Sequence, residues 1–247
     1  MASDLRVQQD PVLGELVQSL RGQIARMEGA RRPACDARVS SGCRQLDAFL
    51  PDKGFRRGTL IEWLTAGEGS GAESLAFLVA REACRGGGTL VVFDQAKQFY
   101  PPAAVRLGID LAGMIVVQAS SQADNLWALD QALRCPAVAA AVAWPEKLDG
   151  RTFRRLQLAA EQGGGLGLLV RPERARREPS WAETRLAVEP LPTAAPNAPR
   201  RLKVQLLRTR GGPSGAIAEV EIDYETHPLH LDFPLVLPTT CRRAAGA

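Results

Sequence analysis

The chain has 247 residues, of which 45% are hydrophobic and 23% are charged, a composition typical of a soluble globular protein. This length fits one domain with appendages, and so much apolar material excludes a wholly disordered chain. The longest unbroken apolar stretch, Ala137–Trp144, has eight residues, whereas about 20 are needed to cross a bilayer. Charged residues among the first ten argue against a signal peptide there. We therefore expect a cytoplasmic protein with no membrane contact.

Neither the cysteines nor the histidines form a pattern that indicates a catalytic or metal site. The five cysteines are scattered without a C-x-x-C pair, which favours reduced, buried thiols. His227 and His230 lie near the C-terminus, in a setting typical of the end of a strand. We therefore predict no metal site and no catalytic residue.

The net charge of +4 is distributed unevenly along the chain. Residues 1–150 carry 16 basic and 17 acidic side chains, whereas residues 151–247 carry 15 and 10. A basic excess of this size permits contact with nucleic acid or with an acidic partner, but it demonstrates neither.

The N-terminal segment Pro11–Gly29 has the periodicity of an amphipathic helix. Its apolar residues recur every three or four positions, and the linker Arg31–Pro33 follows. This apolar stripe either folds back on the core or docks on another protein. We treat residues 1–37 as an N-terminal helix and linker, separate from a core at residues 38–247. The candidate partner-binding residues of the stripe are Leu13, Leu16, Leu20 and Ile24.

From residue 38 onward, predicted strands alternate with predicted helices. The predicted strands are Thr59–Leu64, Thr89–Phe93, Met114–Val117, Val138–Trp144 and Leu166–Val170. The predicted helices are Gly42–Phe49, Ala72–Cys84, Pro101–Leu107, Asn125–Cys135 and Gly150–Gln162. This alternation predicts an α/β fold with a mostly parallel sheet that is covered on both faces. Three later segments, Trp181–Val188, Leu202–Arg208 and Ala216–Asp223, read as strands and predict an antiparallel hairpin extension.

A glycine-rich turn lies between the first predicted strand of this core and the helix that follows it. A phosphate-binding loop has that place and the pattern G-x-x-x-x-G-K-[ST], in which backbone amides cradle phosphates, the lysine reaches them and the hydroxyl holds Mg²⁺. Counted back from Gly71, the first glycine is Ala66, the lysine is Ala72 and the hydroxyl residue is Glu73. Only Gly71 matches a defining position.

The replacements at this turn disfavour a nucleotide. The missing lysine removes a positive charge, and Glu73 adds a negative charge where a triphosphate and Mg²⁺ would lie. A plain strand-to-helix turn that needs glycine for its backbone accounts for the remaining pattern. We therefore predict no bound cofactor. The residues of this degenerate loop are Gly67, Gly69, Gly71, Ala72, Glu73 and Ser74.

Several segments together resemble the core of a RecA-type recombinase. They are Ser40–Asp47, Gly54–Glu62, the glycine-rich turn, Val91–Asp94, Tyr100–Asp110 and Gln118–Arg134. The resemblance covers roughly Val39–Val188 and implies a RecA-like P-loop fold. It also implies where the family's catalytic groups belong. The water-activating glutamate falls at Ala96, the Mg²⁺ aspartate at Trp144 or Pro145, and the γ-phosphate sensor at about Arg171. These departures imply a RecA-like fold that is not an enzyme.

More narrowly, the late segment Arg200–Gly212, followed by Ala218–Asp223, resembles a basic hairpin motif of the ImuA family. That resemblance implies a non-catalytic adaptor in SOS-induced, error-prone translesion DNA synthesis. It implies three partners, namely an ImuB-like inactive Y-family polymerase, RecA and an error-prone polymerase. RecA protomers also pack an N-terminal helix on their neighbours, so the stripe at Pro11–Gly29 is a candidate contact with a RecA filament or within a homo-oligomer.

RecA-type proteins hold DNA with two loops, which the resemblance places at Pro145–Gly150 and Arg171–Ser180. The second is a solvated basic loop, a weak DNA contact or a protein contact, and its candidate DNA-binding residues are Arg171, Arg174, Arg176 and Arg177. Two other functions stay open at this point. One is an ATP-dependent recombinase, and the other is a cell-division inhibitor of the SulA type, which nothing in the sequence supports directly.

The N-terminal stripe can be tested by making it polar. We expect Leu16→Asp combined with Leu20→Asp to abolish partner binding without unfolding the core, because only the apolar face of the helix is changed. The measurement is co-purification of the partners, with circular dichroism as the check on folding. Retained binding by a folded variant would contradict this role.

Overall fold

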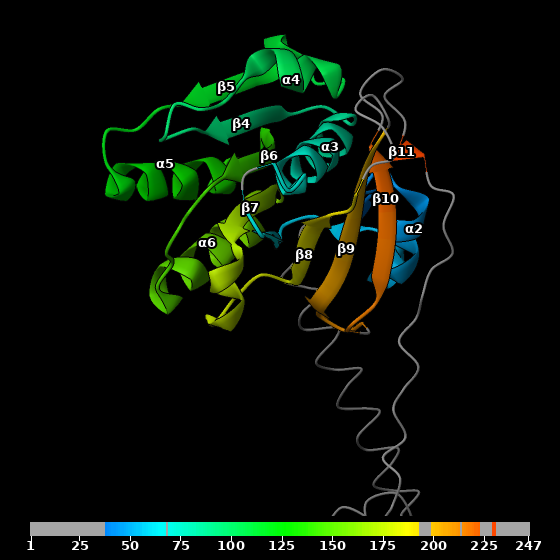
Figure 1. Ribbon diagram of the computed structural model, residues 1–247. Coiled ribbons are helices and arrows are strands. Elements are labelled where there is room, and N and C mark those ends of the chain that lie inside the picture. Colours follow the sequence, from blue (N-terminus) through cyan, green and yellow to red (C-terminus); the bar gives the residue numbers. More distant parts are fainter. Residues whose placement is uncertain (1–37, 68, 193–198, 213, 223–228, 231–247) are drawn as a thin grey trace, which may run out of the picture. The chain divides into compact units, whose positions relative to one another are not determined.

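The structure is a computed structural model that describes residues 38–67, 69–192, 199–212, 214–222 and 229–230 (Figure 1). These residues all belong to Ala37–Ala247, the second of the two units into which the chain divides. The predicted helix Pro11–Gly29 and its partner-binding residues Leu13, Leu16, Leu20 and Ile24 lie outside the described residues. Their role, and the boundary at residue 37, stay predictions.

A nine-stranded sheet forms the centre of this unit (Figure 1). Its order is β11-β10-β9-β8-β3-β7-β6-β4-β5. The strands from β8 to β5 pair in parallel, whereas β9, β10 and β11 extend the sheet in antiparallel fashion. This confirms the predicted α/β fold with its antiparallel extension. The bounds are β3 Leu60–Thr65, β4 Thr89–Phe93, β5 Met114–Val117, β6 Val138–Ala143, β7 Leu166–Pro172, β8 Thr184–Pro190, β9 Arg200–Thr209, β10 Ile217–Ile222 and β11 Leu229–His230.

Helices cover both faces of the sheet. On one face, α2, α3 and α4 pack over a core that includes Ile61 and Trp63 of β3. On the other face, α5 and α6 pack over a core that includes Leu60 of the same strand. Successive side chains of a strand point to opposite faces, so β3 contributes to both cores. The helix bounds are α2 Arg44–Phe49, α3 Ala72–Cys84, α4 Pro101–Arg106, α5 Gln122–Arg134 and α6 Gly150–Gly163. None of the described helices is long and apolar enough to span a membrane.

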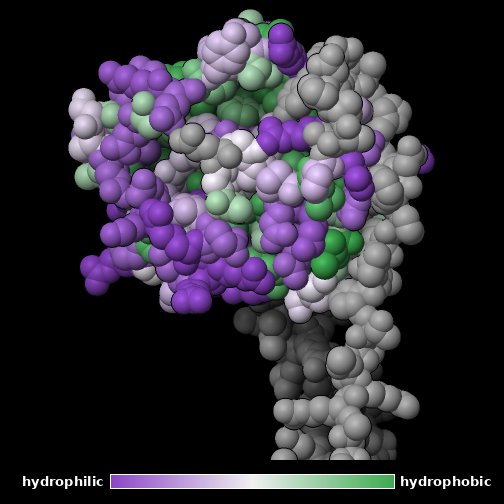
Figure 2. Space-filling view, in the orientation of Figure 1, coloured by the Kyte–Doolittle hydropathy of each residue, from purple (hydrophilic) through white to green (hydrophobic). Residues whose placement is uncertain are grey.

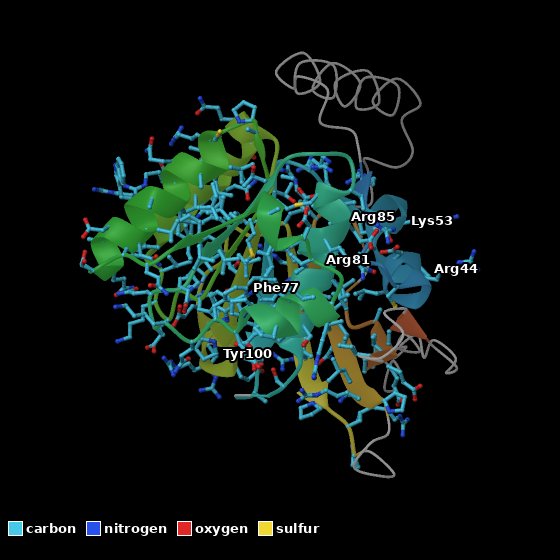
Figure 3. All side chains as sticks on the ribbon, turned by 90° about the horizontal axis from the view of Figure 1, so that it is seen from above. Arg44, Lys53, Phe77, Arg81, Arg85 and Tyr100 are labelled. Atoms are coloured by element: carbon cyan, nitrogen blue, oxygen red, sulfur yellow. The ribbon has the colours of Figure 1, made fainter. Side chains whose placement is uncertain are left out.

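Phe77 and Arg81, four residues apart on α3, contact the segments on either side of α4 (Figure 3). The ring of Phe77 packs against Phe99, with 5.6 Å between ring centroids. Arg81 donates from Nη1 to the carbonyl of Leu107, at 2.9 Å, just after α4. These contacts fix α4 beside α3 and hold the segment that precedes α4.

The sequence-based bounds match the structure closely where periodicity and glycine stops coincide. Helix α3 and strands β4 and β5 begin and end at the predicted residues. Helix α5 begins three residues early, at Gln122, because the hydroxyl of Ser121 accepts a hydrogen bond from the amide of Asp124 and caps it. Strand β8 begins at Thr184, three residues later than predicted. The two-residue strands β1 (Arg38–Val39) and β2 (Phe55–Arg56) were not predicted.

None of the three described cysteines, Cys43, Cys84 and Cys135, forms a disulfide, but Cys135 is exposed, so the expectation of buried thiols is wrong for this residue. Burial raises the pKa of the Cys84 thiol above its ordinary value, and the nearby Arg57 guanidinium opposes this shift. The Cys84 thiol is therefore protonated near neutral pH, which makes it a poor nucleophile.

Candidate functional site

The glycine-rich loop between β3 and α3 is closed by hydrogen bonds among its own residues. The Thr65 hydroxyl, at the end of β3, accepts from the Gly67 amide at 3.1 Å and donates to the Gly67 carbonyl at 2.6 Å. The Ser70 hydroxyl accepts from the Ala72 amide at 3.3 Å, and the Ser70 amide donates to the Gly67 carbonyl at the same distance. Amides of this kind cradle phosphates in a P-loop. Here three of them already have acceptors within the loop.

Strand β9 packs directly against this loop. Gly71 adopts the left-handed conformation, with φ of 88°, and a Cβ atom there would lie 2.5 Å from Cδ1 of Leu202. Arg200, two residues earlier on β9, places its Nη2 atom 3.5 Å from the position of a Gly69 Cβ. Glycine is therefore required at position 71 both for its backbone and for the close approach of Leu202.

The residues at the two positions that the RecA pattern gives to Mg²⁺ contact one another. Glu73 lies in the first turn of α3, and Trp144 directly follows β6. The indole Nε1 of Trp144 donates to Oε1 of Glu73, at 3.0 Å. Because β3 and β6 are parallel strands of one sheet, their carboxyl ends lie at one edge, where α3 also begins. The Glu73 carboxylate therefore has a neutral indole as its hydrogen-bond donor.

An aromatic cluster continues from this pair along the same edge. The Trp144 ring lies 6.1 Å from the Phe77 ring, which in turn packs on Phe99. Phe99 is positioned by the buried Asp94 at the end of β4, whose carboxylate accepts from the amides of Gln98 and Phe99 at 2.9 and 3.1 Å. The Asp94 carboxylate thus shapes the turn that precedes α4.

The other positions singled out in the sequence lie around this edge. Ala72 is fully buried, with its methyl group in the core under α3. Ala96 lies in the exposed turn after β4. Sequence reasoning missed the contacts of Glu73 with Trp144 and of Gly71 with Leu202. The sequence did hold one signal for the contact of Glu73 with Trp144. A hydrogen-bond acceptor and a hydrogen-bond donor occupy two positions that the topology brings to the same end of the sheet.

A buried ionic cluster lies on the opposite face of the sheet, under α6. Glu62, at the middle of β3, is fully buried and contacts an arginine on each neighbouring strand. Its Oε1 lies 2.7 Å from Nη1 of Arg171 on β7, and its Oε2 lies 2.6 Å from Nε of Arg185 on β8. Buried charges are tolerated only when they are paired, and here one carboxylate pairs with two guanidinium groups.

The two arginines of this cluster also anchor the segments that follow β6 and β7. Arg171 donates from Nε to the carbonyl of Pro145, at 3.2 Å, and its Nη2 lies 2.6 Å from a carboxylate oxygen of Glu178. Arg185 donates from Nη2 to the carbonyl of Ala175, at 2.7 Å, within the short helix η3 (Glu173–Arg177). The two segments that the RecA resemblance assigns to DNA are therefore fixed to the sheet.

The assignment of Arg171 to a DNA contact is wrong. Its side chain is fully buried and its guanidinium is engaged by Glu62 and Glu178, so no phosphate reaches it. The rest of the predicted group is exposed. Arg174 pairs with Glu146 at 3.0 Å and Arg176 pairs with Glu173 at 3.1 Å, whereas Arg177 has no carboxylate partner among the described residues. Their contact with DNA stays a proposal.

Comparison with known proteins places the chain in a family. It is 34% identical over 214 residues to Protein ImuA of Caulobacter vibrioides, an alignment that covers 78% of this chain and 88% of that protein. The chain belongs to the ImuA family. It is also 33% identical over 100 residues to Protein RecA of Rhodopirellula baltica, which covers 40% of this chain and 26% of that RecA. No family model matches the sequence.

Comparison with solved structures supports the RecA-like fold of this ImuA-family chain. The crystal structure of the RadB recombinase superposes with a TM-score of 0.62 at 18% sequence identity. The match covers 77% of this chain and 98% of the RadB chain. This confirms the fold that the sequence resemblance predicted.

Replacing Glu62 tests the buried cluster. We expect Glu62→Gln to lower the free energy of unfolding by about 3 kcal/mol, because two buried guanidinium groups lose their shared charge partner. Urea unfolding of the full chain measures this. The control is Glu189→Gln, which removes an exposed ion pair with Lys203 and is expected to cost less than about 0.5 kcal/mol. Equal unfolding midpoints for the two variants would contradict the role of Glu62.

Proposed function

We propose that this protein is a RecA-like adaptor that lacks ATPase activity and acts through protein contacts in SOS-induced, error-prone translesion DNA synthesis. The observation that carries the proposal is the hydrogen bond between Trp144 and Glu73 at the positions where a RecA-type ATPase holds Mg²⁺. Membership of the ImuA family and the RecA-like fold support the biological setting.

The geometry of the loop does not fit a Mg²⁺-bound nucleoside triphosphate. Glu73 places a carboxylate where the phosphates would lie, and like charges a few Å apart repel strongly outside bulk water. At the lysine position, Ala72 offers a buried methyl group in place of a cation. Since the amides of Gly67, Ser70 and Ala72 donate within the loop, a phosphate would have to displace these hydrogen bonds.

An adaptor with this fold would act by binding partner proteins at its surface and would catalyse no reaction. We propose the three partners implied by the family resemblance, which are an ImuB-like inactive Y-family polymerase, RecA and an error-prone polymerase. The RecA-like fold supports a contact with RecA, because similar protomers can share an interface type. A homo-oligomer and a weak DNA contact through Arg174, Arg176 and Arg177 are proposed on the same ground.

Restoring the loop residues tests the absence of catalysis. We expect Ala72→Lys combined with Glu73→Thr to give no ATP turnover, because Ala96 and Trp144 still leave the attacking water and the metal without their carboxylates. Phosphate release measures turnover, and a thermal unfolding curve shows that the variant folds. Turnover by the folded variant would contradict the prediction, and saturable binding of a fluorescent ATP analogue by the unaltered chain would favour the rival ATP-dependent recombinase.

The partners can be identified in cells that encode this protein. We expect the tagged chain, purified after treatment with a DNA-damaging agent, to bring down RecA, an ImuB-like protein or an error-prone polymerase. The untreated culture and an untagged strain are the controls. Recovery of the tubulin-like division protein in their place would favour the SulA-type inhibitor, and recovery of none of the three partners would overturn the adaptor role.

A further inference from the structure

Trp181 is exposed on the surface beside α6, far along the chain from the glycine-rich loop. Its side chain is 47% exposed, and the guanidinium carbon of Arg154 lies 4.8 Å from the centre of its ring. Leu158, one turn after Arg154 on α6, is 44% exposed. Residues four apart on a helix share a face, so the leucine adjoins the arginine that covers the indole. We call Arg151, Arg154, Leu158 and Trp181 the α6 surface.

The backbone that presents Trp181 is fixed on both sides of the residue. Nη2 of Arg208, on β9, donates to the carbonyls of Ser180 and Ala182 at 2.9 and 2.6 Å. Ala182 is itself buried, and Arg185 holds the preceding η3 against the sheet. A side chain on a fixed backbone loses little conformational freedom when a partner binds. The entropic cost of ordering it therefore offsets less of the favourable contact energy.

The α6 surface carries two arginines, and most of the carboxylates around it pair with arginines outside it. The Asp149 carboxylate, which caps α6, stays negatively charged because hydrogen bonds from Thr152 hold its pKa below the ordinary value. Glu173 pairs with Arg176, Glu178 with Arg171 and Glu183 with Arg56, while Glu161 accepts from the Gln157 amide. Among the described residues, no carboxylate pairs with Arg151 or Arg154. Figure 2 shows hydrophilic side chains gathered over α6.

We propose that the α6 surface binds an acidic segment of a partner protein that also carries an apolar side chain. The two arginines without carboxylate partners match the acidic groups, and Trp181 with Leu158 matches the apolar side chain. Tryptophan and arginine are the residues that most often dominate the energy of protein interfaces. This proposal rests on α6 and the turn before β8, and it holds independently of what the glycine-rich loop does.

The same surface is less suited to single-stranded nucleic acid. Proteins that bind single strands stack successive bases on several aromatic rings along a basic groove. Here one indole is exposed, one of its faces is covered by Arg154, and its apolar neighbour is an aliphatic leucine. A protein segment therefore accounts for both the charge and the apolar groups.

A peptide titration tests the proposal. The probe is a fluorescein-labelled peptide of alternating acidic and leucine or phenylalanine residues, and the full chain is titrated into it while anisotropy is followed. We expect a dissociation constant below about 100 µM. We expect Trp181→Ala and Arg154→Glu each to weaken binding roughly tenfold or more, since each removes a central contact. A peptide with serine at every apolar position, and one with lysine at every acidic position, should both bind at least tenfold more weakly.

The matched control is Trp127→Ala, which removes another exposed indole, 63% accessible on α5, and should leave peptide binding unchanged. Circular dichroism confirms that each variant folds. Absence of peptide binding would overturn the proposal, as would equal binding by Trp181→Ala and the unaltered chain. Binding of an oligothymidylate of about 20 nucleotides that is lost in Trp181→Ala, without binding of the peptide, would assign the surface to nucleic acid instead.

Discussion

A single carboxylate, that of Glu62, organises the described part of this protein. It lies at the middle of β3, the strand that joins the parallel strands of the core to β8 and the antiparallel extension. Water is excluded from this position, so the charge is tolerable only while Arg171 and Arg185 flank it. Each arginine uses its remaining donors on backbone carbonyls, Arg171 on Pro145 and Arg185 on Ala175. Through its two arginines, this buried charge helps hold both segments that follow β6 and β7.

At its carboxyl end, β3 leads into the glycine-rich loop, whose residues pack against other parts of the chain. In a P-loop the glycine-rich turn is kept open so that its amides face a ligand. In this chain Thr65 and Ser70 bind those amides, Leu202 fills the space above Gly71, and the Trp144 indole lies against Glu73. Through these contacts, the loop packs against the hairpin of β9 and β10 and connects it with the parallel core. This chain thus combines a RecA-like fold with a glycine-rich loop whose polar groups bond within the chain.

Most of the fold could be predicted because local signals agreed with one another. Glycines lie on both sides of helix α3, Gly88 directly precedes strand β4, and both elements have an unambiguous hydrophobic pattern. Contacts between residues distant in sequence could not be predicted in this way. Arg171 was assigned to a DNA-binding loop because of the RecA resemblance, and its partner Glu62 lies 109 residues earlier. The pairing of Glu73 with Trp144 spans 71 residues. In the sequence, each of these two residues departs from the RecA pattern but does not indicate its partner.

The contact between Trp144 and Glu73 also couples the substitutions that would restore the RecA pattern at this end of the sheet. Glu73→Thr alone leaves the indole donor without its acceptor, Trp144→Asp alone places a second carboxylate beside the first, and Ala72→Lys alone forces an amine into the core. Each single change toward the RecA pattern therefore loses a contact or introduces an unfavourable one, and only a combination of changes avoids this.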